Sequence, residues 1–130
     1  MLIDRRKFLA TTGAAAGLAG LPRMARAQVK SKIKLGIISD LSGPNRDNSA
    51  PSLACAQQAI EDFDAKNRGL DVEVLVADHQ NKPDLASIIA RRWFDVDGVD
   101  CLVDVSTSNT ALAVNSIVRE KNKVMMVVGA

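Results

Sequence analysis

Five short polar side chains follow one another in Ser106-Thr-Ser-Asn-Thr110, and each can donate or accept hydrogen bonds. They lie where an apolar run with strand character, Leu102 to Val105, gives way to the apolar spacing of a helix. The start of a helix presents free backbone N–H groups, and the helix dipole favours an anion there. The turn therefore offers recognition of a carboxylate or an amide. Two interpretations stay open for Ser108 and Asn109: they cap the helix only, or they also contact a ligand.

Three aspartates, Asp40, Asp78 and Asp104, each lie where a predicted strand ends. Such carboxylates could hold a metal ion together, cap their own loops or anchor the amine of a ligand. The single histidine, His79, has no second histidine at metal-ligand spacing, and the two cysteines form no C-x-x-C pair. We therefore expect neither a metal nor a cofactor.

Motifs for nucleotide chemistry and for nucleophilic catalysis are missing from the chain. It contains no GxGxxG sequence after its first strand, no GxxxxGK[ST] phosphate loop and no GxSxG elbow. Ser108 also has no obvious catalytic base in the sequence. We therefore do not expect an enzyme.

Predicted strands and helices, which must position these residues, alternate regularly along the chain. Apolar runs predict strands over residues 33–38, 71–77, 100–105 and 124–128, and apolar residues at helical spacing predict helices over residues 51–69, 83–96 and 109–121. This β-α-β-α-β-α-β order predicts an α/β fold with a doubly wound parallel sheet. Such sheets bind ligands at the carboxyl ends of their strands, which here means loops 39–51, 78–82 and 106–109, with Gly129-Ala130 beginning a fourth.

The apolar faces of the predicted helices indicate what each helix buries. In the first, the spacing predicts burial of Leu53, Ala56, Ile60 and Phe63. In the second, it predicts burial of Leu85, Ile88, Ile89, Trp93 and Val96, which makes Trp93 a core residue rather than a platform for a ligand.

Residues 1–27 have the pattern of an export signal. Arg5-Arg6 stand beside Phe8-Leu9, a short weakly apolar run follows, and Ala25-Arg26-Ala27 supplies a small-x-small cleavage site. The paired arginines are similar to a twin-arginine signal, so we expect cleavage after Ala27 and a periplasmic location. Five of the 17 basic residues and one of the 15 acidic residues lie in this segment, so residues 28–130 carry a net charge of −2. That balance gives no reason to expect a nucleic-acid partner.

Cys55 and Cys101 are the only cysteines. An oxidising compartment allows a disulfide between them, but a disulfide also needs their Cα atoms within about 7 Å of each other. A disulfide and two buried thiols therefore both stay open.

Several blocks of the chain resemble the amino-terminal lobe of the type I periplasmic solute-binding proteins, which serve ABC importers of the branched-chain amino acid and amide class. The resemblance covers residues 32–130, and its blocks are Ile33-Lys-Leu-Gly-Ile-Ile-Ser-Asp-Leu-Ser-Gly-Pro44, Ala59-Ile-Glu-Asp-Phe63, Ala77-Asp-His-Gln-Asn-Lys-Pro-Asp84, Ile89-Ala-Arg-Arg-Trp93 and Arg119-Glu-Lys-Asn-Lys-Val124. The chain departs from the family at Asp104-Val105, where members often have Gly-Pro.

The resemblance implies a two-lobed protein that clamps a small solute between its lobes and delivers it to an ABC permease in the inner membrane. In such proteins a serine after the third strand binds the carboxylate of the ligand, and Ser108 occupies that place between Thr107 and Asn109. The loop at Gly129-Ala130 and the loop at Ser42-Gly43 would add further contacts. Branched-chain amino acids, amides, urea and aromatic acids are the solutes that the resemblance implies.

Residues 28–130 would then form only part of one lobe. Two or three hydrogen bonds of about 1 kcal/mol each do not offset the several kcal/mol that association costs, so we expect this part alone to bind solute weakly. Two other functions stay open. A ligand-sensing regulator of the same fold would work in the cytoplasm, against the export signal, and a twin-arginine-exported enzyme would need a cofactor motif.

Overall fold

The computed structural model describes residues 31–128, so the predicted signal peptide and Gly129-Ala130 lie outside the described residues. Four strands form one sheet in the order β2-β1-β3-β4, and every neighbouring pair is parallel. The strands are β1 (Ser31–Ser39), β2 (Leu70–Asp78), β3 (Cys101–Val105) and β4 (Val124–Met125). This confirms the predicted α/β class with a parallel sheet.

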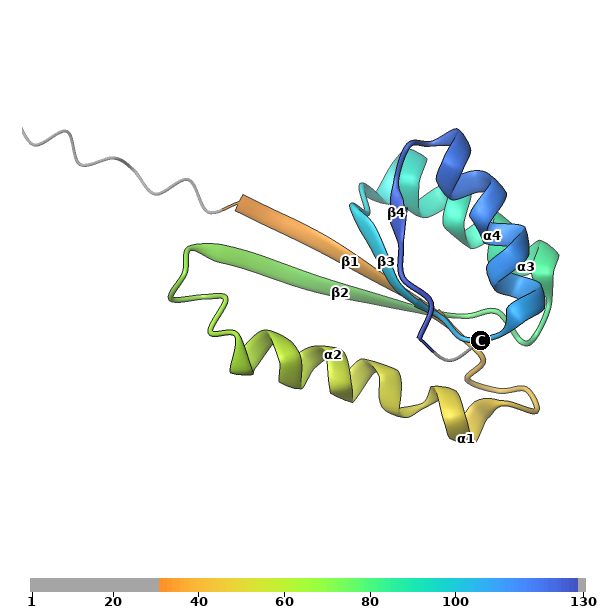
Figure 1. The fold of residues 1–130 in the computed structure, drawn as a ribbon, viewed down its shortest axis with the longest axis horizontal. Helices are drawn as coiled ribbons and strands as arrows, with labels where there is room; N and C mark the ends of the chain where they lie inside the picture. Colours follow the sequence, from red (N-terminus) through yellow and green to blue (C-terminus); the bar gives the residue numbers. More distant parts are fainter. Residues whose placement is uncertain (1–30, 129–130) are drawn as a thin grey trace, which may run out of the picture.

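Helices cover both faces of the sheet (Figure 1). The single turn α1 (Arg46–Ser49) and the helix α2 (Pro51–Asp62) lie on one face, and α3 (Pro83–Arg92) and α4 (Ser108–Glu120) lie on the other. A π-helical turn, Trp93–Asp97, follows α3. All crossovers between parallel strands pass through these helices, which brings the carboxyl ends of β1, β2 and β3 to one edge of the sheet.

The hydrophobic core lies between the sheet and the α3–α4 layer. It is built from buried residues of β1, β3, α3 and α4, and Trp93 belongs to it as predicted. Gly36 on β1 makes room for the indole, because a Cβ at this position would lie 2.7 Å from Trp93 Cζ3 and 2.8 Å from Leu102 Cδ2. The strand and the indole can therefore pack closely only with glycine here.

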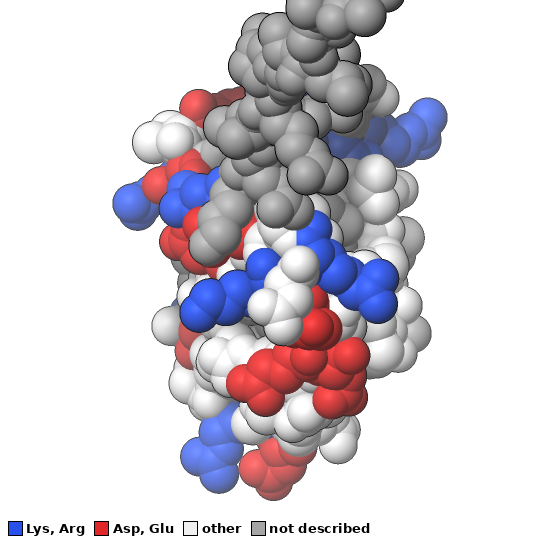
Figure 2. All heavy atoms as spheres, turned by 90° about the vertical axis from the view of Figure 1, so that its left-hand side faces the viewer, with Lys and Arg blue, Asp and Glu red and all other residues white. Residues whose placement is uncertain are grey.

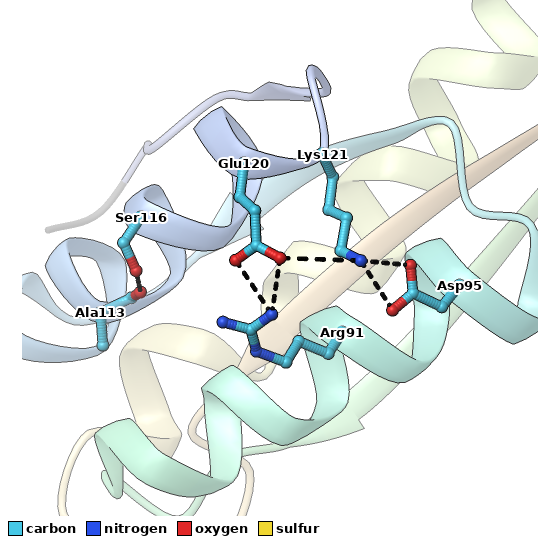
Figure 3. A network of polar contacts seen from close by, with 6 residues as sticks. All are labelled: Arg91, Asp95, Ala113, Ser116, Glu120 and Lys121. Carbon is cyan, nitrogen blue, oxygen red and sulfur yellow. Dashed lines mark hydrogen bonds and ion pairs between the residues drawn. The ribbon is translucent and has the colours of Figure 1, made fainter.

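Ion pairs join α3 and its following turn to the end of α4 on the outer surface of that layer (Figure 3). The guanidinium of Arg91 lies 3.0 Å from Glu120, and the amine of Lys121 lies 2.8 Å from Asp95. At the opposite end of the molecule, Figure 2 shows acidic and basic side chains interspersed, and Lys32 pairs there with Glu73 at 2.9 Å.

Four predicted details of the helices are wrong. The first long helix ends at Asp62 and not near Gly69. Its predicted apolar face is not fully buried, because an open cleft lies between its first turns and the sheet: Leu53, Ala56 and Ile60 are half-buried, and Phe63 beyond the helix is exposed. Ile88 is 64% exposed because Ala86 and Ala90 form the side of α3 that meets the core. Val96 is 75% exposed because the π-helical turn changes the helical phase and buries Phe94 instead.

The last strand is shorter than predicted, with two residues instead of the run 124–128. Only Val124 and Met125 pair with β3, and the N–H of Met126 still donates to the carbonyl of Leu102 before the chain leaves the ladder. Within residues 31–128 no helix combines the length and the apolar character that crossing a membrane requires.

The two cysteines are free thiols. Cys55 is exposed on α2 and Cys101 is half-buried at the start of β3, where burial raises the pKa of its thiol. The expectation of two buried thiols is therefore wrong for Cys55, because its side of α2 lines an open cleft beside the sheet.

Candidate functional site

The loop after β1 is organised by the buried carboxylate of Asp40. Its Oδ1 accepts a hydrogen bond from the backbone N–H of Gly43 at 2.8 Å, and its Oδ2 accepts one from the N–H of Asn45 at 2.9 Å. A Cβ at Gly43 would lie 2.3 Å from that Oδ1, so the loop needs glycine at this position. Asp40 therefore holds its own loop in shape.

Asp78, at the end of β2, ties the same loop to the neighbouring strand. Its Oδ1 accepts from the N–H groups of Leu41 at 3.0 Å and Gln80 at 2.8 Å, and its Oδ2 accepts from the hydroxyl of Ser42 at 2.5 Å. Burial acts to raise the pKa of Asp78, but the hydrogen bonds from Ser42, Gln80 and Leu41 outweigh it and lower the pKa. Ser42 is thus held at the sheet edge by a charged acceptor.

His79 and Ser106 form the buried centre of the three loops. His79 is completely buried, and its Nε2 lies 3.1 Å from Oγ of Ser106, which also accepts the backbone N–H of Asp40 at 3.0 Å. The other ring nitrogen, Nδ1, accepts the N–H of Asn81 at 2.9 Å. An accepting Nδ1 assigns the proton of the neutral ring to Nε2, which then donates to Ser106.

The turn between β3 and α4 carries the run of short polar side chains. Thr107 occupies the N-cap position, and α4 begins at Ser108. The interpretation of Ser108 or Asn109 as the cap is therefore wrong, because the strand runs to Val105 and the helix starts one residue earlier than the spacing predicted. Ser108 and Asn109 are both exposed, and the amide of Asn109 reaches back to Oδ1 of Asn81 at 3.3 Å.

Asp104 lies in a second part of the site, on the face of the sheet that α2 covers. It is 7% exposed, its Oδ2 accepts the hydroxyl of Ser52 at 2.8 Å, and its Oδ1 has no hydrogen-bond partner among the described residues. Both residues line a cleft of about 380 Å³ between the sheet and the first turns of α2. The remaining lining residues are Ile37, Asn48, Pro51, Cys55, Ala56, Val103 and Val128.

The structure thus brings the predicted loops together at one edge, with Ser42 and Gly43 bonded to Asp78 and Asp40 and with the Thr107–Asn109 turn bonded to the loop after β2. Gly129 and Ala130 lie outside the described residues. The three strand-end aspartates take separate partners, and residues 31–128 contain no group of carboxylate, histidine or cysteine side chains placed to hold a metal ion.

Sequence reasoning did not single out the partnerships of His79 with Ser106 and of Asp104 with Ser52. Ser106 belonged to the polar run, and His79 followed a predicted strand, but nothing in their spacing linked the two side chains. Only the pairing of β1 with both β2 and β3 brings them together.

A parallel α/β sheet with polar loops gathered at the carboxyl ends of its strands is an architecture in which small molecules bind at that edge. Residues 32–130 match the sequence model of the family described as periplasmic binding protein, and the chain belongs to that family. This confirms the resemblance drawn from the sequence, and the fold is that of the amino-terminal lobe of such a protein.

Solved structures show the same relationship. A periplasmic binding protein from Burkholderia mallei is 42% identical, with a TM-score of 0.71 over 78% of this chain and 27% of its own. A branched chain amino acid ABC transporter periplasmic ligand-binding protein from Burkholderia xenovorans LB400 is 43% identical, with a TM-score of 0.71 over 75% of this chain and 26% of its own.

A third solved structure shares the fold at lower identity. It is an ABC transporter solute binding protein from R. palustris in complex with 4-hydroxybenzoate, 22% identical with a TM-score of 0.69 over 77% of this chain and 27% of its own. The chain therefore spans about a quarter of the length of these relatives. A comparison with curated proteins found no match.

Proposed function

We propose that the protein is the extracytoplasmic solute-binding component of an ABC importer, and that its described loops form one wall of the solute-binding cleft. Family membership supports the class of protein, and the gathering of three polar loops at one sheet edge supports the place of the cleft. The protein would capture a solute and would not be an enzyme. Its partner would be an ABC permease in the inner membrane.

The observation that carries the proposal is the open start of α4. The N–H of Thr110 bonds to Oδ1 of Asn109, and the N–H of Ala111 bonds to the carbonyl of Thr107. Among the described residues nothing accepts the N–H groups of Ser108 and Asn109, and the Ser108 side chain is exposed beside them. Two N–H groups, a hydroxyl and the positive end of a helix suit a carboxylate or an amide carbonyl.

The solute would therefore be a small molecule with a carboxylate or amide group: a branched-chain amino acid, an amide, urea or an aromatic acid. The related structures include a branched chain amino acid ABC transporter periplasmic ligand-binding protein and a solute binding protein in complex with 4-hydroxybenzoate, which supports amino acids and aromatic acids as candidate solutes. Ser42, Gly43, Gly129 and Ala130 would line the cleft beside Thr107, Ser108 and Asn109. Export through a twin-arginine signal over residues 1–27, cleaved after Ala27, would place the mature protein in the periplasm.

Calorimetric titration of the purified full-length protein with L-leucine, acetamide, urea and 4-hydroxybenzoate tests this function. We expect one of these solutes to bind, and Ser108→Ala to weaken it by about tenfold, as loss of a hydrogen bond to a charged group predicts. Ser116→Ala is the matched control, because this exposed serine of the same helix donates to the carbonyl of Ala113 (Figure 3) and lies away from the turn. Failure of all four solutes to bind, or equal effects of both variants, would overturn the proposal.

A further inference from the structure

We propose that His79 is a positioning residue for the solute, which fixes the turn carrying Ser108 and does so only as the neutral imidazole. The inference rests on the proposed function and adds to it a residue that would not touch the solute. His79 is completely buried, so its ring can act on the cleft only through the groups bonded to it.

The ring joins all three loops of the site. Its Nε2 donates to Ser106 Oγ, at 3.1 Å, and the same oxygen accepts the N–H of Asp40, at 3.0 Å. One serine hydroxyl therefore connects the loop after β1 with the loops after β2 and β3. Ser106 lies two residues before Ser108, so a displacement of Ser106 moves the backbone that presents Ser108 to the cleft.

The opposite side of the ring reaches the same turn by a second route. Nδ1 accepts the N–H of Asn81, at 2.9 Å, and Oδ1 of Asn81 accepts the side-chain amide of Asn109, at 3.3 Å. His79 thus holds the Ser106–Asn109 turn through Ser106 at its start and through Asn81 at its end. A single side chain that restrains both ends of a binding turn pre-organises that turn for its ligand.

This arrangement accommodates one protonation state. A proton on Nδ1 would point at the N–H of Asn81, which places two donors against each other at hydrogen-bond distance. The hydrogen bond would be lost, and the ring or the Asn81 backbone would have to move. Burial accordingly lowers the pKa of His79, although Asp40, Asp78 and Asp104 act to raise it.

The charged groups around the ring form hydrogen bonds with partners other than the imidazole. Asp40 accepts from the N–H groups of Gly43 and Asn45, Asp78 accepts from Leu41, Ser42 and Gln80, and Asp104 accepts from Ser52. In the loop itself, the amine of Lys82 donates to Gln80 at 3.0 Å. None of these groups has a hydrogen bond to the imidazole, so protonation of His79 would gain no direct partner to replace Asn81.

The consequence is a solute affinity that falls in acid. Because the solute-binding form needs the neutral ring, affinity should be constant above the range in which His79 titrates and should drop by at most tenfold for each further pH unit below it. We would measure it by calorimetric titration of the full-length protein with L-leucine and with 4-hydroxybenzoate between about pH 4 and pH 8, because the pKa of His79 lies below its usual value.

His79→Gln separates positioning from simple support of the fold, because the glutamine amide can still donate to Ser106 but does not titrate. We expect this variant to bind several-fold more weakly than the wild type near pH 8, with an affinity that no longer changes with pH. Equal pH dependence in the variant and the wild type, or unchanged affinity of the variant near pH 8, would overturn the inference and leave the proposed function intact. Failure of the wild type to bind either probe would overturn both.

A measurement on the wild type covers the case in which His79→Gln does not fold. In a nuclear magnetic resonance titration of the solute-free protein, protonation of the buried ring should shift the backbone amide signals of Asn81, Asp40 and Ser108 together. A ring that titrates without moving the Ser108 signal would contradict the positioning role.

Discussion

The hydroxyl of Ser52, in the first turn of α2, donates to Oδ2 of Asp104 on β3 at 2.8 Å, across the cleft that both residues line. This contact is a polar link between the sheet and a helix that buries none of its own residues. Oδ1 of the same carboxylate is buried without a hydrogen-bond partner among the described residues. Asp104 therefore holds α2 in place with one oxygen and retains a free acceptor with the other.

Asp104→Asn should destabilise the solute-free protein. The amide oxygen can still accept from Ser52, but the NH2 group would then lie where Oδ1 is buried without a partner, and an unsatisfied buried donor costs about 1–3 kcal/mol. Urea denaturation at neutral pH measures this. Asp47→Asn, at an exposed position of α1, should have no effect, and unchanged stability of Asp104→Asn would contradict the prediction.

Ser42→Ala should destabilise the protein at neutral pH, and the loss should vanish in acid. The Ser42 hydroxyl contributes to the lowered pKa of Asp78, so the stabilising effect is present above the pKa of Asp78 in the unfolded chain and is lost as pH falls through the lower pKa of the folded state. Urea denaturation of both proteins near pH 7 and near pH 3 checks the sign. A difference that persists unchanged near pH 3 would rule out this linkage.

Gly43→Ala should disrupt the loop after β1. The added Cβ would meet the buried carboxylate of Asp40 and break its hydrogen bonds to the loop, which costs about 1–3 kcal/mol and weakens solute binding. Gly98→Ala is the matched control, because nothing lies within 4 Å of a Cβ there and only its positive φ of 70° is unfavourable. That variant should lose about 1 kcal/mol of stability and keep its solute affinity.

Gly36→Ala should disturb the core at the only tryptophan. A Cβ on Gly36 would overlap the indole of Trp93 and the side chain of Leu102, and overpacking of this kind costs about 1–3 kcal/mol. Thermal unfolding gives the loss, and a shift in tryptophan emission locates it. Adding Trp93→Phe to Gly36→Ala should recover part of the stability if overlap with the indole is the cause, and no recovery would assign the loss to Leu102.

The order of the elements could be predicted from the sequence because each depends on a few neighbouring residues. Ile33 to Ile38 and Asp71 to Ala77 carry strand patterns, and Pro83 marks the first turn of a helix. These local patterns were enough to predict the parallel sheet and its three polar loops. The polar run after β3 also indicated the turn that begins α4. The export signal over residues 1–27 and the contacts of Ser108 with a solute stay predictions.

What only the tertiary structure decided was which side chains meet. His79 and Ser106 are 27 residues apart, and Asp40 and Ser106 are 66 apart, so their contacts depend on strand register and not on local pattern. The exposure of Ile88 likewise follows from which side of α3 meets the sheet. Periodicity states that a helix or strand has an apolar side, but long-range packing selects the partners, because pairing of β1 with β2 and β3 sets the distances between their loops.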